Sequence, residues 1–355
     1  MSDTKFIKGC EVFAEGALRA GCRFFAGYPI TPQSEILEYM SQDMVKRGGA
    51  FVQSESEIAA INMVYGASCM GTRAMTSSSS PGVSLKTEGI SYLAGASLPA
   101  VIVSVQRSGP GLGTINAAQG DYLQATKAPG HGGHRCLVYA PTTLQEAADL
   151  MQTAFDKADE YCNPVIVLSD GCMASMMETV TFRDPIPEPL PKHKNALGKY
   201  NKEHHMIAAG SDLPESWEKA LKEKAKMYES WEENEVIVEE YNLDQAEIIL
   251  TGHGSMGRLC RSVAKKLVAK GLPVGCIKPI TLVPFPKKSF RKLDKSIVRR
   301  VISVEMANPG QMICDVAANT PEGIEVSLFS RCGGVIPTQA ELENYISELF
   351  DKGEA

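Results

Sequence analysis

The sequence predicts an α/β protein in which a domain built on a parallel sheet is followed by a smaller α/β domain. Apolar runs of strand length alternate with helix-length segments through the first half of the chain, as in successive β–α units. The segment 98–105 is apolar almost throughout, as expected for a strand that helices cover on both faces. A second strand–turn–helix series begins at residue 246, after a proline-rich stretch.

The length and composition agree with two domains. A chain of 355 residues, of which 44% are hydrophobic, is long enough for about two cores. We expect a first domain over residues 1–182 and a second domain over residues 246–355. Residues 183–245 would join them through the extended linker RDPIPEPLPKHKN and a charged helix over 216–238.

Charge and cysteine usage exclude several classes of function. A net charge of −6 without a basic stripe argues against a nucleic-acid-binding protein. No apolar run approaches the ~18 residues of a membrane span and no apolar signal core is visible, so we expect a cytoplasmic protein without a membrane contact. The ten cysteines are scattered and form no Cys-x-x-Cys, so the sequence predicts no metal site in this chain. Two histidines, His131 and His134, lack a nearby third ligand and are interpreted as part of a polar loop.

The first strand–turn–helix unit surrounds Gly27. A helix over residues 8–20 is followed by a short strand that ends at Gly27. Thr31-Pro32 then predicts a helix start, with Thr31 as the N-cap and Pro32 at the first helical position.

The second unit leads to Glu57. A short strand at 51–52 runs into Ser54-Glu55-Ser56-Glu57, and the three-residue spacing of Ser54 and Glu57 predicts a capping box. Helix capping alone would explain both Thr31 and Glu57. However, both residues follow strands of an open α/β sheet, at the edge where ligands bind, and the helix after Glu57 is rich in small residues.

Two further segments follow strands at the same edge. Residues 77–80 are four serines after the strand 72–76, and their hydroxyl and N–H groups either cap a loop or face a ligand. Arg107 leaves the buried strand for a glycine-rich loop, 109–114, so its guanidinium needs an acceptor. A ligand carboxylate is one candidate acceptor, and an internal ion pair with an acid such as Asp121 is the other.

Taken together, several motifs resemble one family. The strings GYPITPQSE, E-x-x-A-x-x-x-x-x-G from Glu57 to Gly66, TSSSSPG and RSGPGLGT resemble the alpha-type, pyrimidine-domain subunit of the 2-oxoacid:ferredoxin oxidoreductases, and the resemblance spans nearly the whole chain. It implies a thiamine diphosphate-binding pyrimidine domain followed by a transketolase C-terminal-like domain. It also implies a subunit of an enzyme that oxidatively decarboxylates a 2-oxoacid to acyl-CoA and reduces ferredoxin.

The resemblance also implies roles for residues of this chain. Glu57 would contact the pyrimidine N1′ of the cofactor, with Pro29 and Ile30 beside it, and would share a proton there. Thr31 would hydrogen-bond the substrate, and Arg107 would pair with the carboxylate of the 2-oxoacid.

The remaining parts of the enzyme would lie in partner subunits. Ser169-Asp170-Gly171 matches the Mg²⁺–diphosphate signature of thiamine enzymes only in part. We therefore expect the diphosphate end of the cofactor and its Mg²⁺ to be held by a diphosphate-binding-domain subunit. A gamma-type subunit and a ferredoxin-like subunit with [4Fe-4S] clusters would complete the complex, which would use coenzyme A and pass electrons to ferredoxin.

The substrate and two alternative functions remain open. The glycine-rich loop GPGLGT resembles that of the branched-chain (2-oxoisovalerate, 3-methyl-2-oxobutanoate) members, with 2-oxoglutarate and pyruvate as alternatives. The G-x-G-x-x-G spacing of Gly252–Gly257 also fits an NAD-binding dehydrogenase, although the next strand ends in Ile277-Lys278-Pro279 without an acid for the ribose. The third interpretation is a non-catalytic assembly subunit.

Overall fold

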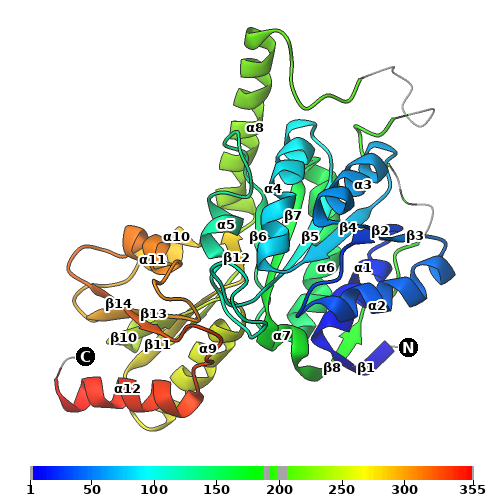
Figure 1. Cartoon of the computed structure of the whole chain (residues 1–355). Coiled ribbons are helices and arrows are strands. Elements are labelled where there is room, and N and C mark those ends of the chain that lie inside the picture. The colour runs from blue at the N-terminus through cyan, green and yellow to red at the C-terminus, as the bar shows by residue number, and fades with distance from the viewer. Residues whose placement is uncertain (1–2, 188–189, 191, 198–205, 354–355) are drawn as a thin grey trace.

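The computed structural model describes residues 3–187, 190, 192–197 and 206–353 (Figure 1). Its larger sheet has seven strands in the order β12-β6-β7-β5-β4-β2-β3, and all neighbours pair in parallel except β12, which runs antiparallel to β6. The predicted parallel sheet is therefore confirmed. Its strands are β2 (Phe24–Gly27), β3 (Ala50–Gln53), β4 (Ala74–Ser78), β5 (Ala100–Gln106), β6 (Leu137–Tyr139), β7 (Pro164–Asp170) and β12 (Thr281–Val283).

Helices cover both faces of this sheet, which is why its central strands are apolar on both sides. One face carries α1, which contacts both α2 and α6, and the other face carries the contacting pair α3 and α4 (Figure 1). The helices of this part are α1 (Gly9–Arg19), α2 (Ser34–Asp43), η1 (Val45–Arg47), α3 (Glu57–Cys69), α4 (Ser80–Gly95), α5 (Tyr122–Thr126), α6 (Leu144–Tyr161) and α7 (Gly171–Ser175). A two-stranded antiparallel sheet joins β1 (Asp3–Lys8) to β8 (Met177–Phe182).

A smaller sheet of five strands, in the order β14-β13-β10-β11-β9, forms the C-terminal part. Its strands are β9 (Val238–Tyr241), β10 (Ile248–Thr251), β11 (Val274–Pro279), β13 (Arg300–Glu305) and β14 (Glu325–Ser330). Its helical segments are η2 (Leu243–Gln245), α9 (Gly254–Ala269), α10 (Lys287–Arg291), α11 (Ile313–Asn319) and α12 (Gln339–Asp351). The long, mostly exposed helix α8 (Pro214–Asn234) rises from the body at the top of Figure 1.

The two sheets exchange strands around the expected boundary at residue 246. β9 precedes this boundary but belongs to the smaller sheet, whereas β12 follows it but pairs with β6 of the larger sheet. We retain 1–182, 183–245 and 246–355 as the proposed division, with these two strands tying its parts together. None of the helices in the described ranges is long and apolar enough to cross a membrane.

Both predicted helix starts near the sheet edge were wrong in detail. α2 begins at Ser34, not at Pro32, and its N-cap is Gln33; the Thr31–Pro32 peptide bond is cis. The N-cap of α3 is Ser56, whose hydroxyl accepts a hydrogen bond from the Ala59 N–H at 3.2 Å. Neither Thr31 nor Glu57 is therefore an N-cap, so helix capping does not account for these two residues.

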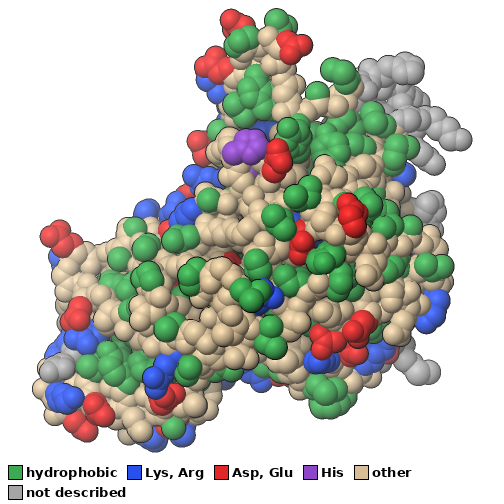
Figure 2. Space-filling model, viewed as in Figure 1, with side chains coloured by type: hydrophobic (Ala, Val, Ile, Leu, Met, Phe, Trp, Pro, Cys, Tyr) green, Lys and Arg blue, Asp and Glu red, His purple; other side chains and the backbone are tan. Residues whose placement is uncertain are grey.

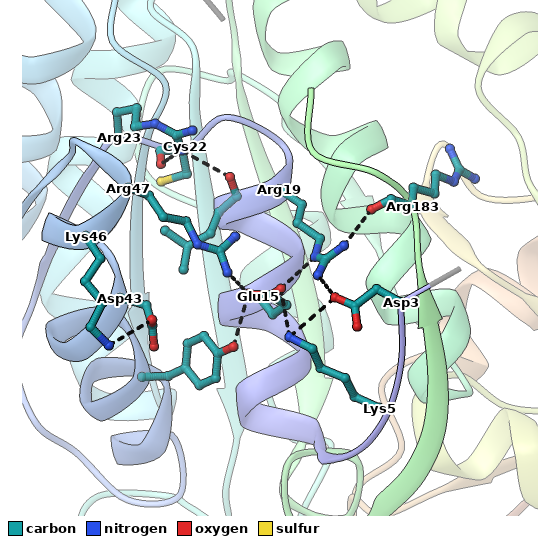
Figure 3. A network of polar contacts seen from close by, with 12 residues as sticks. Asp3, Lys5, Glu15, Arg19, Cys22, Arg23, Asp43, Lys46, Arg47 and Arg183 are labelled. Atoms are coloured by element: carbon teal, nitrogen blue, oxygen red, sulfur yellow. Dashed lines mark hydrogen bonds and ion pairs between the residues drawn. The ribbon is translucent and has the colours of Figure 1, made fainter. Parts of the chain in front are cut away.

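The buried carboxylate of Glu15 connects α1 by hydrogen bonds to β1, α2 and η1 (Figure 3). Glu15 is fully buried and accepts hydrogen bonds from Arg19 and Arg47, both at 2.6 Å, and from Lys5 at 3.2 Å. Tyr39 donates a further hydrogen bond to it at 3.1 Å. Burial raises the pKa of Glu15, but the Arg19 hydrogen bond and the charges of Arg47 and Lys5 outweigh burial and hold this pKa below its usual 4.5.

We expect Glu15→Gln to lower the free energy of unfolding at pH 7 by about 1.5 kcal/mol, the low end for a hydrogen bond to a charged group. Because the folded pKa is depressed, the stabilisation is present above the unfolded pKa and is lost as the pH falls through the folded pKa. The difference between wild type and variant should therefore shrink below pH 4.5. Denaturant unfolding at several pH values measures it. Glu38→Gln, at an exposed position of α2, is the control, and an equal loss there would contradict the role of Glu15.

Candidate functional site

The candidate site lies at the carboxyl edge of the larger sheet, where β2, β3, β4 and β5 end. A cavity of about 580 Å³ opens beside it, between loops of the larger sheet and loops of the C-terminal part. Ser80 and Ser108 border this cavity, but Glu57, Thr31 and Arg107 do not line it. Its lining residues are Ser80, Pro81, Ser84, Ser108, Gly109, Pro110, Gly111, Ala118, Gly120, Asp121, Met306, Ala307, Asn308, Pro309, Gln311, Cys332 and Gly333.

Glu57 is the first residue of α3, and only 6% of it is exposed. A Cβ added at Gly82 would lie 2.4 Å from Glu57 Oε1 and 2.2 Å from Ser78 Oγ, so both side chains reach the backbone of α4 through the space that glycine leaves. Among the described residues, no hydrogen bond or ion pair engages the Glu57 carboxylate. It lies in the first turn of α3 and against the first turn of α4, where unpaired N–H groups favour negative charge.

The hydroxyl groups of two serines at the end of β4 make no hydrogen bond to the described residues. Ser78 Oγ and Ser79 Oγ are buried without a hydrogen-bond partner, although Ser79 occupies the N-cap position of α4. The serine segment is therefore not explained by capping. Buried polar groups without partners are rare, and one of them, Ser78 Oγ, meets the Glu57 carboxylate at Gly82.

Arg107 is 6% exposed and has no carboxylate partner in the described part of the chain. Its Nη1 donates to the Thr31 carbonyl at 3.1 Å and its Nη2 to the Leu112 carbonyl at 3.3 Å, while Nε has no acceptor. The internal ion pair with Asp121 is absent. Asp121 instead accepts a hydrogen bond from Ser80, and burial raises its pKa against the opposing effects of Ser80 and the Arg107 charge.

The loop that contains Pro29, Ile30 and Thr31 is exposed or half-buried in this chain. The buried Gln33 anchors it, because its amide donates to the Tyr28 carbonyl at 3.3 Å and accepts from Ser77 Oγ at 2.5 Å. The structure thus brings Thr31 to Arg107, while Glu57 lies against Ser78 and Gly82. Among the described residues, no hydrogen bond or ion pair joins Glu57 to Thr31 or to Arg107.

Sequence reasoning missed Lys86. This lysine is fully buried on α4, and its Nζ donates to Thr76 Oγ1 at 2.5 Å and to the Ser77 carbonyl at 3.1 Å. Burial lowers its pKa to about 7, and the charge of Glu57 acts in the opposite direction. The sequence spacing indicates a buried position, since Lys86 falls between Val83 and Ile90 on one helical face that is otherwise apolar.

The glycine motif of the C-terminal part holds a carboxylate of the first part. Asp170 accepts hydrogen bonds from the backbone of Cys172 and Met173 in α7 and from the N–H and hydroxyl groups of Ser255 in α9. A Cβ at Gly254 would lie 2.6 Å from Asp170 Oδ2, and φ is +54° there, so glycine is required. Asp170 occupies the helix start where a dinucleotide pyrophosphate would bind, which removes the basis for the NAD interpretation.

Asp170 likewise has a structural role in place of the metal role considered for Ser169-Asp170-Gly171. It joins the starts of two helices from different parts of the chain. Within the described ranges, no group of three or more His, Cys, Asp or Glu side chains is arranged to hold a metal ion.

Comparisons with known proteins give consistent matches. Residues 15–242 match the family described as pyruvate flavodoxin/ferredoxin oxidoreductase, thiamine diP-bdg, and residues 246–342 match pyruvate:ferredoxin oxidoreductase core domain II. The chain is 46% identical over 336 residues to ketoisovalerate oxidoreductase subunit VorB of Methanothermobacter thermautotrophicus, with 93% of this chain and 94% of the relative covered.

Two solved structures share the fold. The 2-oxoglutarate:ferredoxin oxidoreductase of Magnetococcus marinus, with 2-oxoglutarate, coenzyme A and succinyl-CoA bound, superposes with a TM-score of 0.85 at 26% identity, covering 98% of this chain and 65% of that chain. An inactive tetramer of a split-gene transketolase superposes with a TM-score of 0.59 at 12% identity, covering 97% of this chain and 98% of that chain, and shows the fold alone.

Proposed function

The chain belongs to the 2-oxoacid:ferredoxin oxidoreductase family, and we propose that it forms the pyrimidine and substrate side of the active site in a ketoisovalerate-type member. The family and the fold that the motifs resembled are both confirmed. The enzyme carries out CoA-dependent oxidative decarboxylation of a 2-oxoacid and reduces ferredoxin. The observation that carries the proposal is a pair of charged groups at one sheet edge: among the described residues, the buried Glu57 has no hydrogen-bond partner for its carboxylate and the buried Arg107 has no carboxylate partner for its guanidinium.

The residues at Glu57 fit the pyrimidine end of thiamine diphosphate. When bound, the cofactor would supply a nucleophilic ring carbon and an electron sink. Glu57 would hold and move a proton at ring nitrogen N1′, and the unpartnered hydroxyls of Ser78 and Ser79 would complete the polar surface there. Pro29 and Ile30 would lie beside the ring as the apolar part of the site.

Thr31 and Arg107 fit the carboxylate of the substrate. The Thr31 carbonyl holds one nitrogen of Arg107, so the two residues form a single unit, and the unpartnered Nε offers a further donor. A 2-oxoacid carboxylate would compensate the buried charge through a two-point contact. The Thr31 hydroxyl would hydrogen-bond the substrate.

Two observations favour a branched-chain 2-oxoacid over 2-oxoglutarate. No residue that lines the cavity beside Arg107 is basic, so the second carboxylate of 2-oxoglutarate would find no cation there. The identity to the ketoisovalerate relative is 46%, against 35% to the 2-oxoglutarate synthase subunit KorA of Methanocaldococcus jannaschii. We propose 3-methyl-2-oxobutanoate as the substrate.

We propose that a diphosphate-binding-domain subunit covers this site and holds the Mg²⁺ and the diphosphate. Large apolar side chains are exposed on α3 and α4, the helices beside Glu57, and Figure 2 shows hydrophobic side chains over these helices. The exposed residues on these helices are Ile58, Met63, Leu85 and Tyr92, and the exposed Met70 directly follows α3. A gamma-type subunit and a ferredoxin-like subunit with [4Fe-4S] clusters would complete the complex, and the ten unpaired cysteines of this chain fit a reducing cytoplasm.

Steady-state assays of the assembled complex test the proposed substrate. We expect kcat/KM for 3-methyl-2-oxobutanoate to exceed kcat/KM for pyruvate and 2-oxoglutarate by at least about tenfold, the scale of one to two methylene groups in an apolar pocket. Coenzyme A-dependent ferredoxin reduction is the readout for all three acids. A higher kcat/KM for 2-oxoglutarate would overturn the substrate assignment and leave the family assignment intact.

A further inference from the structure

Lys86 has a property that the proposed reaction does not yet use: it is a fully buried lysine without a carboxylate ion pair among the described residues. Its two acceptors, the Thr76 hydroxyl and the Ser77 carbonyl, are neutral. Burying an ammonium group beside neutral partners alone is costly. A core position on α4 could be filled more favourably by an apolar side chain.

The geometry places this lysine opposite Glu57. Gly82 lies one helical turn before Lys86 on α4, so both residues belong to the same face of the helix. Glu57 Oε1 meets that face at Gly82, where an added Cβ would lie 2.4 Å away. The Glu57 carboxylate reaches this face of α4 beside Ser78, and the Lys86 ammonium is held by Thr76 and Ser77 of the same strand.

Other charged groups around α4 are occupied elsewhere. The strands β4 and β5 beneath the helix carry no charged side chain. Asp121, before α5, accepts a hydrogen bond from Ser80 at the start of α4, and Asp170 at the end of β7 binds the first turns of α7 and α9. Glu88 is exposed on α4. Among the described residues, Glu57 is the one charge that opposes the effect of burial on the pKa of Lys86.

We propose that Lys86 is a positioning residue that acts through Glu57: its buried ammonium, held at the end of β4, keeps the Glu57 carboxylate ionised and directed toward the cofactor end of the site. The proposal rests on the proposed function, because the partner of Glu57 is taken to be the pyrimidine ring. The end of β4 also contacts the loop that contains Thr31. Ser77 Oγ donates to the side-chain oxygen of Gln33, and the Gln33 amide donates to the Tyr28 carbonyl. Lys86 would thus support both ends of the site.

The first test changes the pH profile of proton exchange in the assembled complex. Lys86→Met keeps the length of the side chain and removes its charge. If Lys86 keeps Glu57 ionised, the acidic limb of the rate of deuterium exchange at C2 of thiamine diphosphate should move up by about one pH unit, a roughly tenfold loss on that limb. The rate should recover at higher pH. Lys46→Met, at an exposed position, is the control and should keep the wild-type profile. An unchanged profile in Lys86→Met overturns the proposal.

The second test does not depend on activity. The ¹³Cε resonance of Lys86 in the labelled full chain, identified by its loss in Lys86→Met, should titrate with a midpoint of about 7. Glu57→Gln removes the opposing charge, so this midpoint should fall by about one pH unit. Because Glu57→Gln leaves Lys86 in place, this measurement decides the question even if the Lys86→Met chain does not fold. A midpoint that is the same in wild type and Glu57→Gln overturns the proposal.

The two tests also separate this inference from the proposed function. Coupled titration together with no cofactor exchange in the wild-type complex would overturn the proposed function and support the Lys86–Glu57 pair. Normal exchange in the wild-type complex with no coupling in either test would leave the proposed function standing and remove Lys86 from the site.

Discussion

Glu57→Gln slows deuterium exchange at C2 of thiamine diphosphate in the assembled complex by about 10²–10⁴, the range for the loss of a positioned general acid–base group. The substitution preserves the size of the side chain and replaces its ionisable carboxyl group with a neutral amide. Stability should change little, because Ser56 and not Glu57 caps α3, and the Glu57 carboxylate makes no hydrogen bond in the described part of the chain. Exchange followed by proton NMR measures the effect.

Glu55→Gln is the matched control for this experiment. Glu55 is two residues away in the same turn, is exposed, and should leave the exchange rate at the wild-type value. If Glu57→Gln also leaves the rate unchanged, Glu57 has no proton role. The interpretation as a non-catalytic assembly subunit would then be favoured.

Arg107→Lys weakens binding of the 2-oxoacid by about 10- to 150-fold, which corresponds to roughly 1.5–3 kcal/mol for a charge-assisted hydrogen bond. Lysine keeps the charge but cannot form the planar two-point contact. It also loses one of the two contacts to the Thr31 and Leu112 carbonyls, so a small loss of thermal stability accompanies the change. Thermal unfolding and the substrate dissociation constant should be measured on one preparation.

Arg135→Lys, at an exposed position, provides the matched control and should alter neither quantity. A destabilised Arg107→Lys variant with wild-type affinity would contradict the substrate role. Arg107 would then be a structural residue that ties the Thr31 loop to the loop of Leu112.

The strands around the site could be predicted because their signal is local. Apolar runs that end in Gly27, in the serine segment and in Arg107 place these residues at one edge of a parallel sheet, and the structure confirms the strands. The helix starts could not be predicted in the same way. The sequence pattern predicts a capping box with Ser54, but Ser54 Oγ donates to the Gly27 carbonyl of the neighbouring strand, a contact that no local pattern contains, and Ser56 is the N-cap.

The roles that the sequence did not predict depend on contacts between segments that are apart in the chain. Gln33 is buried because it bridges two loops, and Asp170 is buried because it joins the starts of α7 and α9. The G-x-G-x-x-G spacing forms a tight turn between β10 and α9, and only the three-dimensional structure shows that Asp170 binds there. Lys86 stood out in the apolar pattern of α4, but only the contact at Gly82 connects it with Glu57.

The central claim is that this chain supplies only one end of a shared cofactor site. Isothermal titration calorimetry with thiamine diphosphate and Mg²⁺ tests it on the full chain alone and on the assembled complex. We predict no saturable heat for the chain alone, since the described residues hold no metal-ligand group for the diphosphate end, and saturable binding for the complex. Saturable binding by the chain alone, with a dissociation constant in the micromolar range, would contradict the claim.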